Sequence, residues 1–213
     1  MSLSQILSQI NKELKAKNML RERMLKDARR TLKLSKECIL LVQGGKLKAA
    51  KRKLKVAEAT LKRIIKLLEF SPELRYGGAM HEACQEFAEA SILLRLEEDG
   101  SFPTPEEVGV DPQAYLLGLA DIVGELRRMV LSRLMAGDMA EAERKFRLME
   151  EIYYGLSTLD EQVYSVVSGL RRKCDIARHL LELTGSDVMV EVRQRRLERV
   201  LRALEKYSKL RRK

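Results

Sequence analysis

Tryptophan is absent from this sequence, aromatic residues make up only 5% of its 213 residues, and proline occurs four times. Alternation of apolar and polar residues, which marks a half-buried strand, is rare along the chain. Leu, Ala, Glu, Lys, Arg and Met dominate instead, as they do in helix-rich proteins. Hydrophobic residues amount to 45%, which is enough for a substantial core. These features predict a globular all-α protein.

Histidine is also scarce, since His81 and His179 are the only two. A Ser-His triad or a ribonuclease built on a histidine pair therefore has little to work with. The stretch HEAC at 81–84 lacks the second histidine of a zinc-protease helix, and no Glu-x-x-His motif supports a ferritin-like iron site. The glycine pairs at 44–45 and 77–78 lack the pattern of a phosphate-binding loop.

Long apolar runs are missing too, since nothing approaches the ~18 unbroken apolar residues of a membrane span. The N-terminal segment carries charges where a secretory signal needs an apolar run. We therefore expect a cytoplasmic protein that does not contact a membrane. The cysteines lie far apart within helical apolar patterns, which predicts buried free thiols instead of disulfides or a metal site. They are Cys38, Cys84 and Cys174.

The net charge of +10 is distributed unevenly. Residues 1–70 hold 19 Lys and Arg against 6 Asp and Glu, residues 71–165 hold 8 against 19, and residues 166–213 hold 14 against 6. A chain that is basic at both ends and acidic in the middle is expected to bind a polyanion through its ends. Nucleic acid is the natural candidate, although lysine-rich helix faces can also serve solubility alone.

Apolar residues recur at helical spacing through almost the whole chain, and its connections are short except for a loop at 97–111. Sequential helices should therefore pack roughly antiparallel, as a bundle of about seven helices in one domain spanning 1–213. Glycine stops and Asp caps set the boundaries. The predicted helices are 2–43 with a candidate break near Asn18, 46–70, 78–97, 112–136, 139–156, 158–183, and a last one after Thr184-Gly185-Ser186. The first two form a basic region at 1–70, and the C-terminal helices occupy 158–213.

The helix predicted at 78–97 carries three glutamates on one side. At about 100° per residue, Glu82, Glu86 and Glu89 fall within an arc of roughly 60°. Further along the helix, the same face carries leucine. A solvated helix face normally stays polar along its length, so the pattern favours carboxylates that face a pocket. The alternative is an ordinary surface on which Glu82 pairs with Arg75 or with a basic helix.

The otherwise apolar helix at 112–136 carries a second acidic pair. Asp121 and Glu125 lie one turn apart on one face. Gly118 and Gly124 are their neighbours, and glycine lets another backbone or a ligand approach closely. An Asp in such surroundings is costly unless it is paired or metal-bound. Glu125 has a simpler explanation, because Arg128, three residues further along the helix, can neutralise its charge.

If these two acidic helices pack side by side, their carboxylates can converge on one point. Several oxygen ligands together suit Mg²⁺ or Mn²⁺, and two such ions about 3.5–4 Å apart can activate water and stabilise the leaving oxygen of a phosphodiester. Acidic residues three or four apart on helices are also common surface decoration, so spacing alone leaves both interpretations open. The candidate residues are Glu86, Glu89, Asp121 and Glu125.

Several segments, in order along nearly the whole chain, resemble the translin and Trax family. They are RERMLKDARRTLKLSKECILLVQGG, LLGLADIVGELRRMVLSRLMAGD, IYYGLSTLD and LRRKCDIARHLLELTGSD. The first is similar to the long basic helix of that family, and the stretch around Asp121 is the most specific. The resemblance implies a seven-helix subunit that assembles into a hollow barrel of about eight chains, with active sites and RNA-binding surface inside.

Within that family, Trax is a metal-dependent endonuclease subunit, whereas translin binds nucleic acid without the catalytic carboxylates. QEFAEA resembles the Trax pattern, which implies that Glu86 and Glu89 bind metal and are catalytic, and ADIVGEL adds Asp121 with Glu125 beside it. MHE at 80–82 is closer to translin. One chain with features of both is expected to form a homo-oligomer, because its last two helices are apolar over a greater length than one small domain needs. The resemblance implies an Mg²⁺- or Mn²⁺-dependent endoribonuclease for single-stranded or short structured RNA, with single-stranded DNA as a further candidate.

The match to the basic helix also implies phosphate contacts, and the alternative for each of these residues is an ordinary solvated side chain. The residues are Arg21, Arg29, Arg30, Lys33 and Lys36.

Three other functions stay open. The same barrel can bind single-stranded RNA or DNA with its carboxylates idle, as translin does. An all-α nucleotide pyrophosphohydrolase also carries Glu-x-x-Glu followed by acids on a later helix, although the later pair here is Asp-x-x-x-Glu and not Glu-x-x-Asp. Hydrolysis of free nucleotides would support it. A scaffold protein without a ligand would show no salt-dependent RNA binding.

Overall fold

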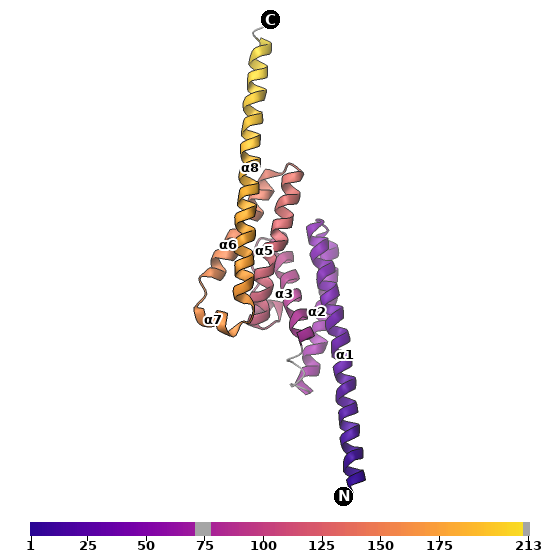
Figure 1. Ribbon diagram of the computed structural model, residues 1–213. Helices are drawn as coiled ribbons and strands as arrows, with labels where there is room; N and C mark the ends of the chain where they lie inside the picture. Colours follow the sequence, from indigo (N-terminus) through magenta and orange to yellow (C-terminus); the bar gives the residue numbers. More distant parts are fainter. Residues whose placement is uncertain (71–77, 211–213) are drawn as a thin grey trace. The chain divides into compact units, whose positions relative to one another are not determined.

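A computed structural model of the protein describes residues 1–70 and 78–210. The described chain is helical and contains no strand (Figure 1), so the all-α prediction is confirmed. None of the described helices is long and apolar enough to span a lipid bilayer. The helices are α1 (Leu3–Gln43), α2 (Leu47–Phe70), α3 (Gly78–Glu98), α4 (Pro105–Val108), α5 (Pro112–Met135), α6 (Met139–Ser157), α7 (Glu161–Val166) and α8 (Leu170–Leu210).

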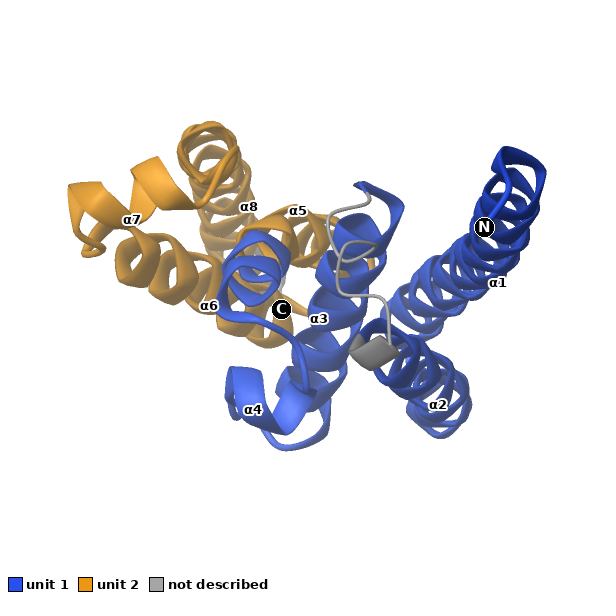
Figure 2. Cartoon of the chain, turned by 90° about the horizontal axis from the view of Figure 1, so that it is seen from below, with its two compact units in different colours: residues 1–119 blue, residues 120–213 orange. Residues whose placement is uncertain are grey.

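The chain divides into two compact units, residues 1–119 and residues 120–213 (Figure 2). The division falls inside α5, so the start of this helix belongs to unit 1 and the remainder to unit 2. The single domain over 1–213 stays a prediction. Arg75, the predicted partner of Glu82, lies outside the described residues, as does the basic tail at 211–213.

In unit 1, α1 and α2 form an antiparallel pair, and both pack against α3. Two ion pairs give the register of α1 and α2. Asp27 Oδ1 lies 3.5 Å from Arg63 Nη2, and Glu37 Oε2 lies 2.6 Å from Lys53 Nζ. These contacts neutralise two acidic residues of α1 on the side that faces α2. The core between the helices includes Met24, Ala28, Ile64, Leu68 and Phe87.

The predicted break near Asn18 is wrong, because α1 continues without interruption from Leu3 to Gln43. An interior Asn costs at most about 0.7 kcal/mol relative to Ala, which the surrounding Lys, Leu and Met residues tolerate. A capping box fixes the start of the helix, where Ser2 Oγ accepts a hydrogen bond from Gln5 N at 3.3 Å and Gln5 Oε1 accepts one from Ser2 N at 2.8 Å. The stop at Gly44-Gly45 is confirmed, since Gly45 has a left-handed φ of 69°.

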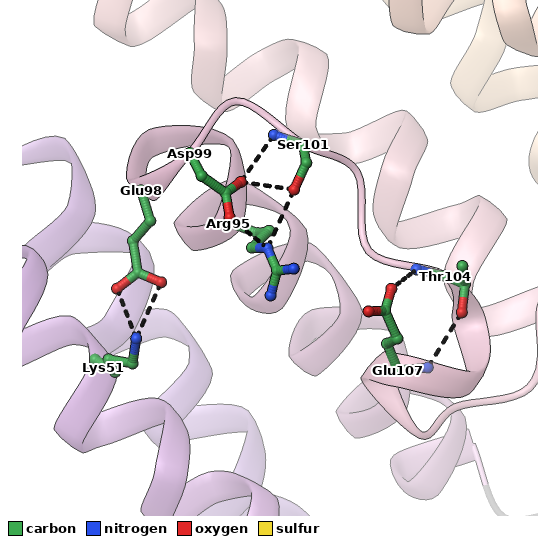
Figure 3. A network of polar contacts seen from close by, with 7 residues as sticks. All are labelled: Lys51, Arg95, Glu98, Asp99, Ser101, Thr104 and Glu107. Carbon is green, nitrogen blue, oxygen red and sulfur yellow. Dashed lines mark hydrogen bonds and ion pairs between the residues drawn. The ribbon is translucent and has the colours of Figure 1, made fainter.

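The predicted long loop contains a short helix, α4, that the sequence analysis missed. Its start is a capping box, in which Thr104 Oγ1 accepts from Glu107 N at 3.3 Å and Glu107 Oε2 accepts from Thr104 N at 2.8 Å (Figure 3). Just before it, Asp99 Oδ1 accepts hydrogen bonds from Ser101 N at 3.0 Å and from Ser101 Oγ at 2.6 Å. The Arg95 Nε atom lies 2.8 Å from Asp99 Oδ2, which ties the end of α3 to this loop.

In unit 2, α6 and α8 pack together, and α8 runs through Thr184-Gly185-Ser186. The predicted separation of two helices at these residues is therefore wrong. The Thr184 and Ser186 hydroxyls donate to carbonyls four residues earlier, at 2.6 and 3.2 Å, so both are satisfied within the helix. Gly185 serves packing, because a Cβ there would lie 3.3 Å from Cζ of Phe146 on α6.

The helix break in this part of the chain lies earlier, between α7 and α8. Gly169 has a φ of 85° immediately before α8 begins, a conformation that favours glycine. Tyr164 of α7 donates a hydrogen bond to the Leu156 carbonyl oxygen at 2.6 Å, which holds this short helix against the end of α6. The helix predicted at 158–183 is thus replaced by a short α7 and the first part of α8.

Gly118 brings the start of α5 against α3 within unit 1. A Cβ at this position would lie 2.7 Å from Gln85 O and 2.9 Å from Glu89 N, both of them backbone atoms of α3. The expectation that glycine allows a close approach here is confirmed. Gly124 differs, since a Cβ there would make an ordinary contact of 3.8 Å with Leu180 Cδ1.

Replacing Gly118 with Ala is expected to destabilise the protein by about 1–3 kcal/mol, because backbone atoms cannot yield as a flexible side chain can. The matched control is Gly155→Ala in α6, where an added Cβ meets nothing within 4 Å. That change should leave stability equal or raise it by up to about 1 kcal/mol. Chemical denaturation of both variants measures the difference, and equal stabilities would contradict the close contact at Gly118.

Candidate active site

The three predicted glutamates of α3 become more buried in the order in which they follow along the helix. Glu82 is exposed, the Glu86 side chain is 17% exposed, and Glu89 is 6% exposed. The face of α3 that carries them therefore turns inward, as its leucine continuation predicts. His81, beside Glu82, is exposed.

Glu86 lies next to a residue of the basic helix. Lys36 Nζ of α1 is 4.0 Å from Glu86 Oε2, and the lysine side chain is 57% exposed. A contact of this length between partly solvated groups is a weak ion pair, worth less than about 1 kcal/mol. Its significance is geometric, because it places the edge of the cationic side of α1 beside the carboxylates of α3.

The five basic residues predicted to contact phosphate are all exposed on α1. Lys33 and Lys36 follow Arg29 at spacings of four and three residues, so these three line one face of the helix. Arg21 lies two turns earlier, and Arg30 points about 100° away around the helix axis. Together they cover a broad cationic side of α1, whose counter-charges at Asp27 and Glu37 face α2.

The acidic residues of α5 belong to unit 2 and have basic partners there. Lys173 Nζ of α8 lies 2.5 Å from Asp121 Oδ1 and 2.7 Å from Asp121 Oδ2. Arg128 Nη1 lies 3.2 Å from Glu125 Oε1, which is the neutralising pair expected from the sequence. Asp121, which needs a partner among its apolar neighbours, is paired with the ammonium group of Lys173. The Asp121 side chain is 28% exposed.

Lys173 is a residue that the sequence analysis missed. A signal for it existed in RRK at 171–173, where three cations occupy the first turn of α8, and this turn has no acidic residue. Cations are unfavourable at a helix N-terminus, so such a cluster indicates an anion nearby. Arg171 is paired with Glu161, and Lys173 with Asp121.

The carboxylates fit a hard divalent cation by their chemistry. Glu86 and Glu89 offer only oxygen donors from one face of α3, and Asp121 and Glu125 offer the same from α5. In residues 1–70 and 78–210, no three His, Cys, Asp or Glu side chains gather into a ready metal-binding group. Mg²⁺ keeps several of its waters and is commonly bound by one or two carboxylates, so a pair on one helix is a sufficient start for a site.

Cysteine chemistry is disfavoured. Burial raises the pKa of the Cys38 thiol to about 12, with Glu98 adding to the shift, so this thiol stays protonated at neutral pH. Cys84 is buried, Cys174 is half-buried, and none of the three forms a disulfide. The prediction of free thiols is confirmed, and the expectation that each is buried fails for Cys174, whose pKa burial also raises.

A groove of about 320 Å³ lies on the other side of α3, between α2 and the loop that leads into α4. Its rim carries charges that are paired with each other. Lys51 Nζ lies 3.1 Å from Glu98 Oε1, and Arg95 contacts Asp99 (Figure 3). None of the predicted site residues lines this groove.

Comparison with known proteins identifies the family. The model of the translin family matches residues 19–182, which is most of the chain. The chain belongs to the translin family. All of the candidate carboxylates and basic residues lie inside the matched range, and so does Lys173. The first part of α1 and the last part of α8 lie outside it.

Relatives of this translin-family chain have similar length and fold. An uncharacterized protein of Methanocaldococcus jannaschii is 34% identical over 194 residues, which cover 89% of this chain and 84% of that protein. The crystal structure of AfC3PO is 34% identical, with a TM-score of 0.78 over 89% of this chain and 98% of that one. A structure of AfC3PO in complex with duplex RNA matches with 34% identity and a TM-score of 0.77, over 89% of this chain and 97% of that one.

Proposed function

We propose that this protein is an Mg²⁺-dependent endoribonuclease that cleaves single-stranded or short structured RNA, with single-stranded DNA as a second candidate substrate. The basic side of α1 binds the phosphate chain, and the carboxylates of α3 bind the metal. The carboxylates of α5, in unit 2, are further candidate ligands. RNA binding is supported by the family and by the similar protein that was solved with duplex RNA. Mn²⁺ is the alternative metal, because it accepts the same oxygen ligands.

The observation that carries this proposal is the contact between Lys36 and Glu86. It joins a cationic helix side to an inward-facing acidic pair within one unit, at 4.0 Å. A phosphate chain held by Arg29 and Lys33 therefore runs toward the carboxylates instead of away from them. If the charges served only solubility, there would be no reason for Lys36 of the basic side to lie beside Glu86 of the acidic pair.

In this proposal the side chains of the protein bind the metal ion and orient its ligands. Glu86 and Glu89 present two carboxylates from one face of α3, with Gly118 fixing the helix backbone at this turn. Asp121 supplies a further ligand, and Glu125 orients it or binds as well. The chemistry supplied by a bound divalent cation is Lewis acidity, which makes water a better nucleophile and offsets charge on the leaving oxygen.

The assembly is part of the proposal. We infer a homo-oligomer, because α8 extends beyond the family match with apolar side chains facing solvent. About eight copies is the number that the family resemblance implies. Leu197, Leu201 and Leu204 are 51–61% exposed at spacings of four and three residues. Such a stripe is typical of a helix that packs against another chain. A particle of 24.5 kDa in light scattering would contradict this part.

A second function, nucleic-acid binding without cleavage, is favoured by one observation. Glu86, Asp121 and Glu125 each have a basic side chain within 4.0 Å, so these three carboxylates are neutralised without a metal. Both functions require the basic side of α1. Only cleavage requires the carboxylates to bind a metal.

Glu89→Gln is expected to lower the rate of RNA cleavage in Mg²⁺ by about 100-fold or more, because it removes a negative metal ligand. The matched control is Glu82→Gln on the same helix, where the side chain is exposed, and this change should leave the rate unchanged. Cleavage of a labelled single-stranded RNA with and without EDTA is the measurement. Equal rates for Glu89→Gln and the parent would rule out the catalytic assignment, and no cleavage by the parent would favour binding alone.

Arg29→Ala is expected to weaken binding to RNA of any sequence and to reduce the slope of log affinity against log salt by about 0.7, because one phosphate contact is lost. The control is Arg147→Ala, which removes the same charge from an exposed position on α6 in the acidic middle of the sequence. Fluorescence anisotropy at several salt concentrations measures both. An unchanged slope for Arg29→Ala would place Arg29 on an ordinary solvated surface.

A further inference from the structure

Lys173 contacts both oxygens of Asp121 within unit 2. The distances of 2.5 and 2.7 Å mean that the ammonium group occupies the space in front of the carboxylate, where a metal ion would also bind. The two side chains are 25% and 28% exposed, so the pair is reachable from solvent. A divalent cation bound to both of these oxygens would have to displace the lysine.

The location of Lys173 in α8 does not serve helix stability. It lies in the first turn, where the helix dipole disfavours a cation by about 0.3–1 kcal/mol. Arg171 in the same turn is compensated by Glu161 and by the ring of Tyr164, which lies 5.2 Å from the guanidinium carbon. The partner that compensates Lys173 is Asp121, a proposed metal ligand, which suggests that the lysine acts on that carboxylate.

We propose that Lys173 is a positioning residue that competes with the divalent cation for Asp121 and, once displaced, binds a phosphate group of the RNA. This inference rests on the proposed function of the carboxylates. In the absence of metal, the ammonium neutralises Asp121 and holds its side chain. When the carboxylate is engaged by metal, the lysine is released from it and can bind a phosphate group of the RNA.

The side chain of lysine suits this exchange better than arginine does. Its ammonium is a compact charge on a flexible four-carbon stem, so it can move from a carboxylate to a phosphate by rotation of its own side chain. Arginine at the same place would hold the carboxylate by a rigid pair of hydrogen bonds. Competition is mild, because pairs between partly exposed groups are weak. The effect of the lysine on metal affinity is therefore a few-fold.

Sharing one lysine couples the two ligands of the site. RNA that binds Lys173 frees Asp121 and strengthens metal binding, and by reciprocity metal strengthens RNA binding through the same residue. A lysine that only stabilised the fold would give no such coupling. The two roles can thus be separated by binding measurements that do not depend on turnover.

The test uses the full-length variants Lys173→Met, Lys173→Arg and Asp121→Asn, with Arg171→Met as a control for loss of one charge in the same turn. Circular dichroism and thermal unfolding first establish that each is folded, and Lys173→Arg provides a folded variant that keeps the charge. Mn²⁺ binding is measured by electron paramagnetic resonance of free Mn²⁺. Affinity for a fluorescent phosphorothioate RNA strand is measured by anisotropy with and without Mn²⁺.

We expect Lys173→Met to bind Mn²⁺ about two- to fivefold more tightly than the parent, while Lys173→Arg binds it no more tightly. Arg171→Met should stay close to the parent. The gain in RNA affinity on adding Mn²⁺ should be smaller in Lys173→Met than in the parent. Mn²⁺ affinity that is unchanged or weaker in Lys173→Met, or an equal gain in RNA affinity, overturns the role of Lys173 and leaves the metal site standing. Equal Mn²⁺ binding by the parent and Asp121→Asn overturns Asp121 as a metal ligand, and this inference with it.

Discussion

The close approach of α5 to α3 at Gly118 is the contact on which the candidate site depends. Only a residue without a Cβ can bring the α5 backbone this near to α3. A Cβ at position 118 would lie 2.7 Å from Gln85 O and 2.9 Å from Glu89 N, which is too close for real atoms. The backbone atoms approached belong to the turn of α3 that carries Glu86 and Glu89. Any side chain at position 118 would push α5 away from this turn, and the geometry of the acidic pair would change with it.

Charge compensation is the second organising feature of the chain. In unit 1, Asp27 and Glu37 of α1 are neutralised by α2, which leaves the exposed side of α1 cationic. Lys36 stands at the border between that side and Glu86. In unit 2, Lys173 neutralises Asp121 from the first turn of α8. A buried or half-buried carboxylate needs such a cationic partner, because its charge is costly to bury alone.

Much of the fold follows from local signals in the sequence. The bounds of α2, α3 and α5 follow from apolar periodicity together with glycine stops and the cap at Asp111, whose Oδ1 accepts from Ala114 N at 2.9 Å. The errors have local causes too. Thr-Pro-Glu-Glu at 104–107 forms a capping box within a segment whose composition predicts a loop. Thr184-Gly185-Ser186 has the composition of a helix stop. The sequence does not show that its hydroxyls are hydrogen-bonded within a helix or that its glycine packs on Phe146.

The acidic residues of the candidate site could be proposed from the sequence, whereas their basic partners on other helices could not. Spacing and resemblance identify Glu86, Glu89 and Asp121, but contacts between distant segments, such as 36 with 86 and 121 with 173, depend on tertiary packing. Sequence spacing carries no information about them. The partner of Asp121 is 52 residues away, and the only hint of it is an unfavourable cation cluster at the start of a helix.

The central proposal is that carboxylates of this chain, first of all the acidic pair of α3, bind a divalent cation. A crystal of the protein grown with Mn²⁺, with data collected at the manganese absorption edge, tests it directly. We expect an anomalous peak within about 2.0–2.4 Å of carboxylate oxygens of Glu86, Glu89 or Asp121. Saturating Mn²⁺ without anomalous density at any of these side chains, with Lys173 still on Asp121, would contradict it.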